Sequence, residues 1–70
     1  MRFGSKNVLG PEHVGRRVTV RRALPEGGKS DTIGILSSFG ETEVVVVDRT
    51  GTHVRIARAD IVAARVIEQG

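Results

Sequence analysis

The stretch Thr42-Glu43-Val44-Val45-Val46-Val47-Asp48 decides the fold class of this 70-residue chain. Four consecutive valines favour a β-strand, because β-branched side chains lose rotamer freedom in a helix and pack well on a pleated sheet. Successive residues of a strand point to opposite faces, so this strand is apolar on both faces. We therefore predict a strand at 42–48 in an all-β domain, with more apolar surface than one core requires.

The segments on either side of this strand also have the pattern of strands. Residues 52–57 alternate, with Val54 and Ile56 facing inward, and residues 16–24 alternate in the same way. Between them, residues 32–39 contain Gly34, which indicates a bend or a close approach of backbone. The last segment, 61–67, favours a strand, although its Ala, Arg and Glu content also suits a helix. The expected core consists of Val18, Val20, Leu36, Val44, Val46, Val54, Ile56, Ile61 and Val66.

These five short strands are spaced about ten residues apart, with turn signals between them, which is typical of a small barrel or sandwich. The connector at 58–60 is short enough for a single 3₁₀ turn before the last strand. We expect a five-stranded SH3-like barrel over residues 14–67. A flexible arm over residues 1–13, with one turn at 11–13, precedes it, and a tail over 68–70 follows.

Several runs resemble one known family. They are the run from Gly15 to Arg22, the pair Leu24-Pro25, the segment 31–36, and above all the segment 51–66. The chain resembles, over residues 14–67, the SH3-like domain at the N-terminus of actinobacterial GNAT-type (histone) acetyltransferases. The resemblance implies an accessory module that precedes a catalytic domain. It also implies that the acetyl-CoA site lies outside these 70 residues.

Composition excludes several classes of function. The chain has no cysteine, so it has neither a disulfide framework nor a thiolate zinc site. No signal peptide follows Met1, and the longest apolar run is too short to span a membrane, so we expect a soluble cytoplasmic protein with no membrane partner. Two Phe and no Trp or Tyr exclude the aromatic groove that binds polyproline and the aromatic cage that binds methyl-lysine.

No group of residues has the pattern of a catalytic or metal site. Residues 23–30 match a relaxed phosphate-loop pattern, but a strand-like segment follows where that motif requires a helix. His13 and His53 are the only histidines, and we expect His53 to be a solvated surface residue. We therefore expect no catalytic residues, no metal and no cofactor, and predict that this chain by itself is not an enzyme.

Two surfaces remain as candidate sites. The first hypothesis is a protein-interaction module, which packs on a catalytic domain in cis, or on a copy of itself, through the surplus apolar residues Ile33, Ile35, Val45 and Val47. The alternative is a weak, sequence-independent nucleic-acid binder with a stripe of arginines, because the net charge is +3 and nine of the eleven basic residues are arginine. The stripe would consist of Arg17, Arg21, Arg49 and Arg55, although these could equally form surface ion pairs.

Overall fold

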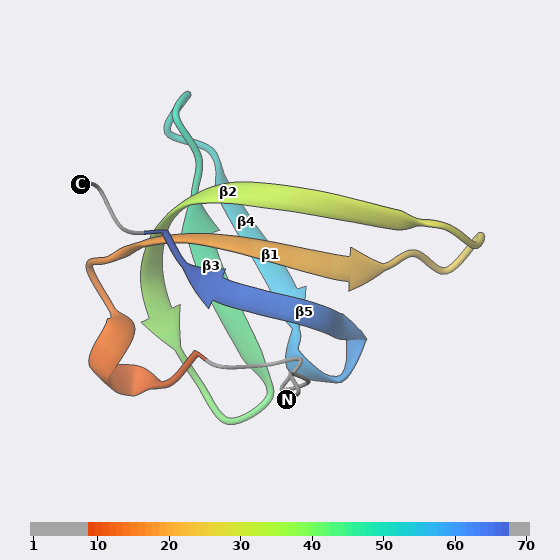
Figure 1. Ribbon diagram of the computed structural model, residues 1–70, viewed down its shortest axis with the longest axis horizontal. Helices are drawn as coiled ribbons and strands as arrows, with labels where there is room; N and C mark the ends of the chain where they lie inside the picture. Colours follow the sequence, from red (N-terminus) through yellow and green to blue (C-terminus); the bar gives the residue numbers. More distant parts are fainter. Residues whose placement is uncertain (1–8, 68–70) are drawn as a thin grey trace.

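The computed structural model describes residues 9–67, which form five antiparallel strands in one bent sheet (Figure 1). The elements are η1 (Pro11–His13), β1 (Arg17–Ala23), β2 (Lys29–Phe39), β3 (Glu43–Val47), β4 (His53–Ala57), η2 (Arg58–Asp60) and β5 (Ile61–Val66). The order of strands across the sheet is β4-β3-β2-β1-β5. The predicted all-β, barrel-like fold is confirmed, including the 3₁₀ turn before the last strand. The last segment is a strand and not a helix.

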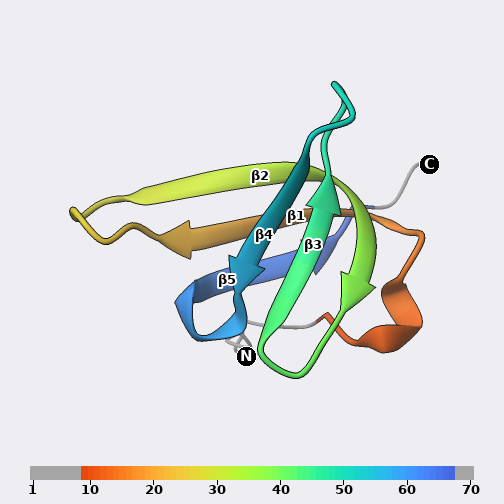
Figure 2. The same cartoon turned by 180° about the vertical axis from the view of Figure 1, so that it is seen from behind.

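Strand β2 belongs to both halves of the sheet. Its residues 29–35 pair with β1, and its residues 35–39 pair with β3. Ile35 is where the two pairings meet, opposite both Arg17 and Val47. The two cartoon views show β2 lying along β1 at one end and curving round to lie along β3 at the other (Figures 1 and 2). The curvature of this one strand therefore gives the sheet its barrel-like form.

Gly34 allows the backbone at the end of β3 to approach β2 closely. A Cβ atom at this position would overlap the carbonyl oxygen of Val47 and would lie 2.8 Å from its carbonyl carbon. Because every other amino acid carries a Cβ, only glycine fits without a shift of the backbone. The sequence prediction of a bend or close approach at Gly34 is confirmed.

One predicted boundary is wrong. β2 begins at Lys29, whereas the sequence pattern places this strand at residues 32–39, so the connection from β1 is shorter than expected. The reason is pairing, because Arg21, Arg22 and Ala23 lie opposite Asp31, Ser30 and Lys29. Cross-strand pairing overrides the weak strand propensity of these polar residues.

The core forms from the inward-facing residues of all five strands. The buried apolar residues are Leu9, Val18, Val20, Leu36, Val44, Val46, Ile56, Ile61 and Ala64. Two residues of the expected core, Val54 and Val66, are only partly buried and pack against it. Seven of the nine expected core residues are therefore buried, and Leu9 and Ala64 join them.

Leu9 lies within the segment expected to be a flexible arm, and its side chain is only 7% exposed. The turn η1 follows it, and the imidazole Nδ1 of His13 accepts a hydrogen bond from the Gly10 amide at 3.0 Å. The Gly15 amide then donates to the Leu36 carbonyl at 2.8 Å, which joins this segment to β2. The expected turn at 11–13 is confirmed, while residues 1–8 of the arm and the tail at 68–70 lie outside the described residues.

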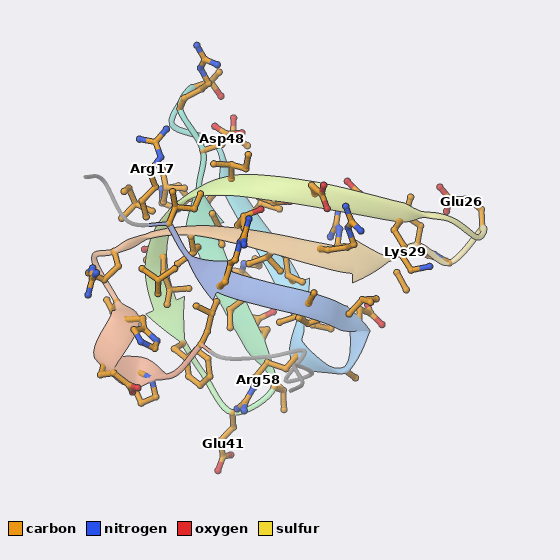
Figure 3. All side chains as sticks on the ribbon, in the orientation of Figure 1. Arg17, Glu26, Lys29, Glu41, Asp48 and Arg58 are labelled. Atoms are coloured by element: carbon orange, nitrogen blue, oxygen red, sulfur yellow. The ribbon has the colours of Figure 1, made fainter. Side chains whose placement is uncertain are left out.

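Arg58 ties η2 to the turn between β2 and β3 (Figure 3). Its Nη1 atom donates to the carbonyl oxygens of Gly40 and Glu41, both at 3.0 Å. Its guanidinium lies 4.6 Å from the centre of the Phe39 ring, within the range of a cation–π contact. The guanidinium of Arg58 therefore covers one face of the Phe39 ring and helps to hold this side chain in place.

Replacing Leu9 by alanine tests whether the segment before η1 is part of the core. Loss of a buried leucine side chain costs about 2–5 kcal/mol, so we expect Leu9→Ala to lower the free energy of unfolding by at least about 2 kcal/mol. Val14→Ala is the control, because Val14 is 46% exposed. Urea unfolding measures both variants, and equal, small effects would show that Leu9 does not pack in the core.

Gly34→Ala tests the close approach of β2 and β3. The added Cβ must displace the Val47 backbone, and such overpacking costs about 1–3 kcal/mol. We expect a large drop in the urea midpoint, with Ser37→Ala on the exposed side of the same strand within about 0.5 kcal/mol of the wild type. A Gly34→Ala variant as stable as Ser37→Ala would contradict this account of the bend.

Candidate interaction surface

Large apolar side chains lie on the outside of the sheet, along β2. Ile33 is 51% exposed and Ile35 is 43% exposed. The two are adjacent on the outer face, because the intervening Gly34 belongs to the inner face and is buried. The facing of this segment could not be decided from the sequence. The structure assigns both isoleucines to the outside.

The register of the strands extends this apolar surface across the sheet. Ile35 lies opposite Arg17 on β1 and opposite Val47 on β3. Val47 in turn lies opposite His53 on β4. Neighbouring side chains in such a row are close enough to contact one another. Ile33, Ile35 and Val47 therefore form one outward-facing apolar cluster.

This cluster is the floor of an open hollow of about 400 Å³. Its rim carries four charged residues, which are Arg17, Asp31, Asp48 and Arg49. Figure 3 shows Arg17 and Asp48 at the same end of the molecule, beside the hairpin that joins β3 to β4. We call this feature the β2 hollow, with the floor and rim defined by these seven residues.

The carboxylate of Asp31 is already occupied by an arginine. Arg21 Nε donates to its Oδ1 at 2.8 Å, and Arg21 Nη2 donates to its Oδ2 at 3.2 Å. The hydrogen bond from Arg21 is the main cause that lowers the pKa of Asp31. Both side chains are about half exposed, so the pair contributes little to stability. Because Arg21 balances its charge, Asp31 adds no net negative charge to the hollow.

The carboxylate of Asp48 is occupied by the hairpin itself. Its Oδ1 accepts hydrogen bonds from the Thr50 hydroxyl at 2.6 Å, the Thr50 amide at 2.9 Å and the Thr52 amide at 3.0 Å. The Thr50 hydroxyl and then the Thr52 amide are the chief causes that lower the pKa of Asp48. Asp48 therefore caps the backbone amides of its own turn.

Two of the four arginines of the predicted stripe line the β2 hollow, and the other two do not. Arg17 and Arg49 line the β2 hollow, and among residues 9–67 neither forms an ion pair. Arg21 is held by Asp31, and Arg55 on β4 lies 3.9 Å from the Glu43 carboxylate. Two of the four arginines therefore form surface ion pairs, as the alternative interpretation expects.

Three of the four predicted interface residues lie together. Ile33, Ile35 and Val47 meet in the floor of the hollow. Val45 is half-buried and lies opposite Ser38 and Arg55, outside the lining of the hollow. The rim residues Asp31 and Asp48 were not predicted as part of a site, because their positions there depend on strand register and on the path of the hairpin.

The other chemical motifs form no site in the described part of the chain. The phosphate-loop pattern at 23–30 begins at the last residue of β1, spans the hairpin connection and ends within β2, so a strand stands where that motif requires a helix. His53 is exposed. Among residues 9–67, no three histidine or acidic side chains lie close enough to hold a metal ion, and no helix is long and apolar enough to cross a membrane.

The hydrogen bonds to Asp48 predict an acid-dependent loss of stability. Its folded-state pKa is lowered, so its contribution is complete above the ordinary value of 3.8 and is lost as the pH falls through the lower folded value. We expect Asp48→Asn to be less stable than the wild type at pH 7 and the difference to shrink in acid.

Thermal unfolding of both proteins between about pH 7 and pH 2 measures this difference. Asp60→Asn serves as the control, because it removes the same charge from a turn residue whose side chain has no hydrogen bond with another described residue. If the melting temperatures of the wild type and Asp48→Asn differ by the same amount at every pH, the role of the Asp48 carboxylate is contradicted.

Comparison with known proteins agrees with this architecture. No curated protein matches the chain. A family model described as the Rv0428c N-terminal Sm-like domain matches residues 12–65, which span β1 to β5 except for Val66. The chain therefore belongs to the family of the Rv0428c N-terminal Sm-like domain.

Proposed function

We propose that this domain is a non-catalytic interaction module that packs against a protein partner through the β2 hollow. The observation that carries the proposal is the exposure of Ile33 and Ile35 side by side on the outer face of β2. Covering two half-exposed isoleucines would stabilise a complex by about 2 kcal/mol, at roughly 1 kcal/mol each. The adjacent Val47 extends the same apolar surface onto β3.

The partner we propose is a catalytic domain of the GNAT acetyltransferase type, joined to this module in one cytoplasmic protein of the kind found in actinobacteria. Two considerations support this choice. The family description is that of an N-terminal domain, and the chain resembles the domain that precedes such acetyltransferases. In addition, the Ile67 amide donates to the Arg17 carbonyl at 2.8 Å, so the end of β5 lies beside the β2 hollow. A domain joined after β5 could reach the hollow through a short linker.

Nucleic-acid binding is less well supported by the same surface. Phosphate contacts require several uncompensated cations, and two of the four candidate arginines are already paired with carboxylates. Binding of single strands also requires aromatic side chains on which bases stack. Phe39 is the one aromatic residue within the described range, and Arg58 covers its ring.

The double variant Ile33→Thr with Ile35→Thr tests the proposal. Threonine keeps the β-branched shape but removes apolar surface, and both positions are exposed, so the fold should be retained. We expect a separately produced GNAT domain to bind the wild-type chain in an isothermal titration, and the double variant to bind about tenfold more weakly or not at all, since the lost burial of about 2 kcal/mol exceeds a factor of ten.

Val14→Thr is the matched control, because Val14 is 46% exposed and does not line the hollow. Its affinity should equal that of the wild type. Absence of binding by the wild type, or equal binding by all three proteins, would contradict the proposal. So would salt-sensitive binding of a short DNA duplex that the isoleucine substitutions leave unchanged.

A further inference from the structure

We propose that the partner segment that enters the β2 hollow is acidic as well as apolar, with carboxylates on both sides of a leucine-like side chain. This inference rests on the proposed function and specifies the chemistry of the partner. It follows from the charges that remain available at the rim once the contacts within the domain are accounted for.

The two acidic residues of the rim are occupied within the domain. Asp31 is bound by two nitrogens of Arg21, and Asp48 accepts three hydrogen bonds from its own hairpin. Both carboxylates are held in their ionised form by these donors. An incoming basic group would therefore compete with Arg21 at Asp31. Asp48 keeps its negative charge because its donors are neutral, so one carboxylate charge stands against the two arginines of the rim.

The two arginines of the rim are available. Neither Arg17 nor Arg49 has an ion pair or hydrogen bond from its side chain to another of residues 9–67, and both are exposed. A guanidinium binds a carboxylate through two parallel hydrogen bonds, so each is suited to a glutamate or an aspartate of a partner. The charge offered by the hollow is positive, although its rim contains equal numbers of acids and bases.

The arginines lie on opposite sides of the apolar floor. Arg17 is on β1, and Arg49 follows β3 by two residues, while Ile33 and Ile35 lie on β2 between those strands. Neighbouring strands are about 4.8 Å apart, so β1 and β3 are separated by about 10 Å. An extended segment covers that distance in about three residues. Side chains of an extended segment alternate between its two faces, so two acids that both face the hollow, with an apolar side chain between them, are four residues apart. That spacing exceeds the separation of the strands by only a few ångströms, which the long arginine side chains can cover. The pattern acid, x, apolar, x, acid therefore matches the hollow.

Charge also favours a different chain over a second copy of this one. The chain carries a net charge of +3, so two copies repel each other. In a two-fold dimer through this surface, Arg17 and Arg49 of one copy would face the same arginines of the other. An acidic partner is attracted both by the net positive charge of the chain and by the two arginines of the rim.

The test is a titration of the isotopically labelled chain with three short peptides, followed by NMR. The first has the core Glu-Ser-Leu-Ser-Glu, the second Lys-Ser-Leu-Ser-Lys and the third Glu-Ser-Ser-Ser-Glu. We expect the first to shift the amides of Ile33, Ile35 and Val47, and the other two to bind at least about tenfold more weakly, because each lacks either the charge or the apolar contact.

Two double variants with the same change in net charge identify the cations. Arg17→Gln with Arg49→Gln should weaken binding of the first peptide by about five- to tenfold, since exposed charge pairs contribute modestly. Arg55→Gln with Arg65→Gln should leave it unchanged, because neither residue lines the hollow. Equal weakening by both double variants would overturn the inference, since it would reflect net charge alone.

The outcomes separate this inference from the proposed function. If the GNAT domain binds, and Ile33→Thr with Ile35→Thr abolishes that binding while Arg17→Gln with Arg49→Gln does not, the interaction module stands and the acidic partner is wrong. Equal binding of the lysine peptide would also overturn the acidic partner and leave the interaction module standing. If Glu-Ser-Ser-Ser-Glu or a short DNA duplex binds as well as the first peptide, the surface is a general polyanion site, and both the interaction module and the acidic partner are overturned.

Discussion

The approach of the Val47 backbone to Gly34 is the contact on which the rest of the structure depends. β2 must pair with β1 in its first half and with β3 in its second, and these partners overlap at a single residue, Ile35. A side chain at position 34 would separate β2 from the end of β3. Because glycine is present, one sheet bends enough to enclose the inward-facing apolar residues of all five strands, and so small a chain obtains a core without disulfides.

The same bend creates the proposed binding surface. Gly34 occupies an inward position, so its neighbours Ile33 and Ile35 both face outward, where the domain itself does not cover them. Val47 is brought beside Ile35 by the pairing of β2 with β3, and the hairpin that begins at Asp48 forms one wall of the hollow. Stability and the proposed interaction therefore depend on the same short segment, whose inner side joins the core and whose outer side is the proposed contact with a partner.

The sequence was sufficient for the strands, the 3₁₀ turn and most of the core, because alternation in 16–24, 42–48 and 52–57 is a local property. It was insufficient where the outcome depends on distant residues. Leu9 lies in a segment with no periodic apolar pattern, and its burial follows from packing. The early start of β2 follows from pairing with β1, and the contact of Arg21 with Asp31 follows from register. The facing of Ile33 and Ile35 was ambiguous because both are apolar.

The central claim is that a protein partner covers Ile33 and Ile35. The most direct measurement is the solvent accessibility of their δ-methyl groups by NMR, with a soluble paramagnetic agent, for the domain alone and for the domain joined through its C-terminal end to a GNAT catalytic domain. The account predicts strong relaxation of both methyl groups in the isolated domain and clear protection in the fused protein, while the methyl groups of Val14 stay exposed in both. Equal relaxation of Ile33 and Ile35 in the two proteins would contradict it.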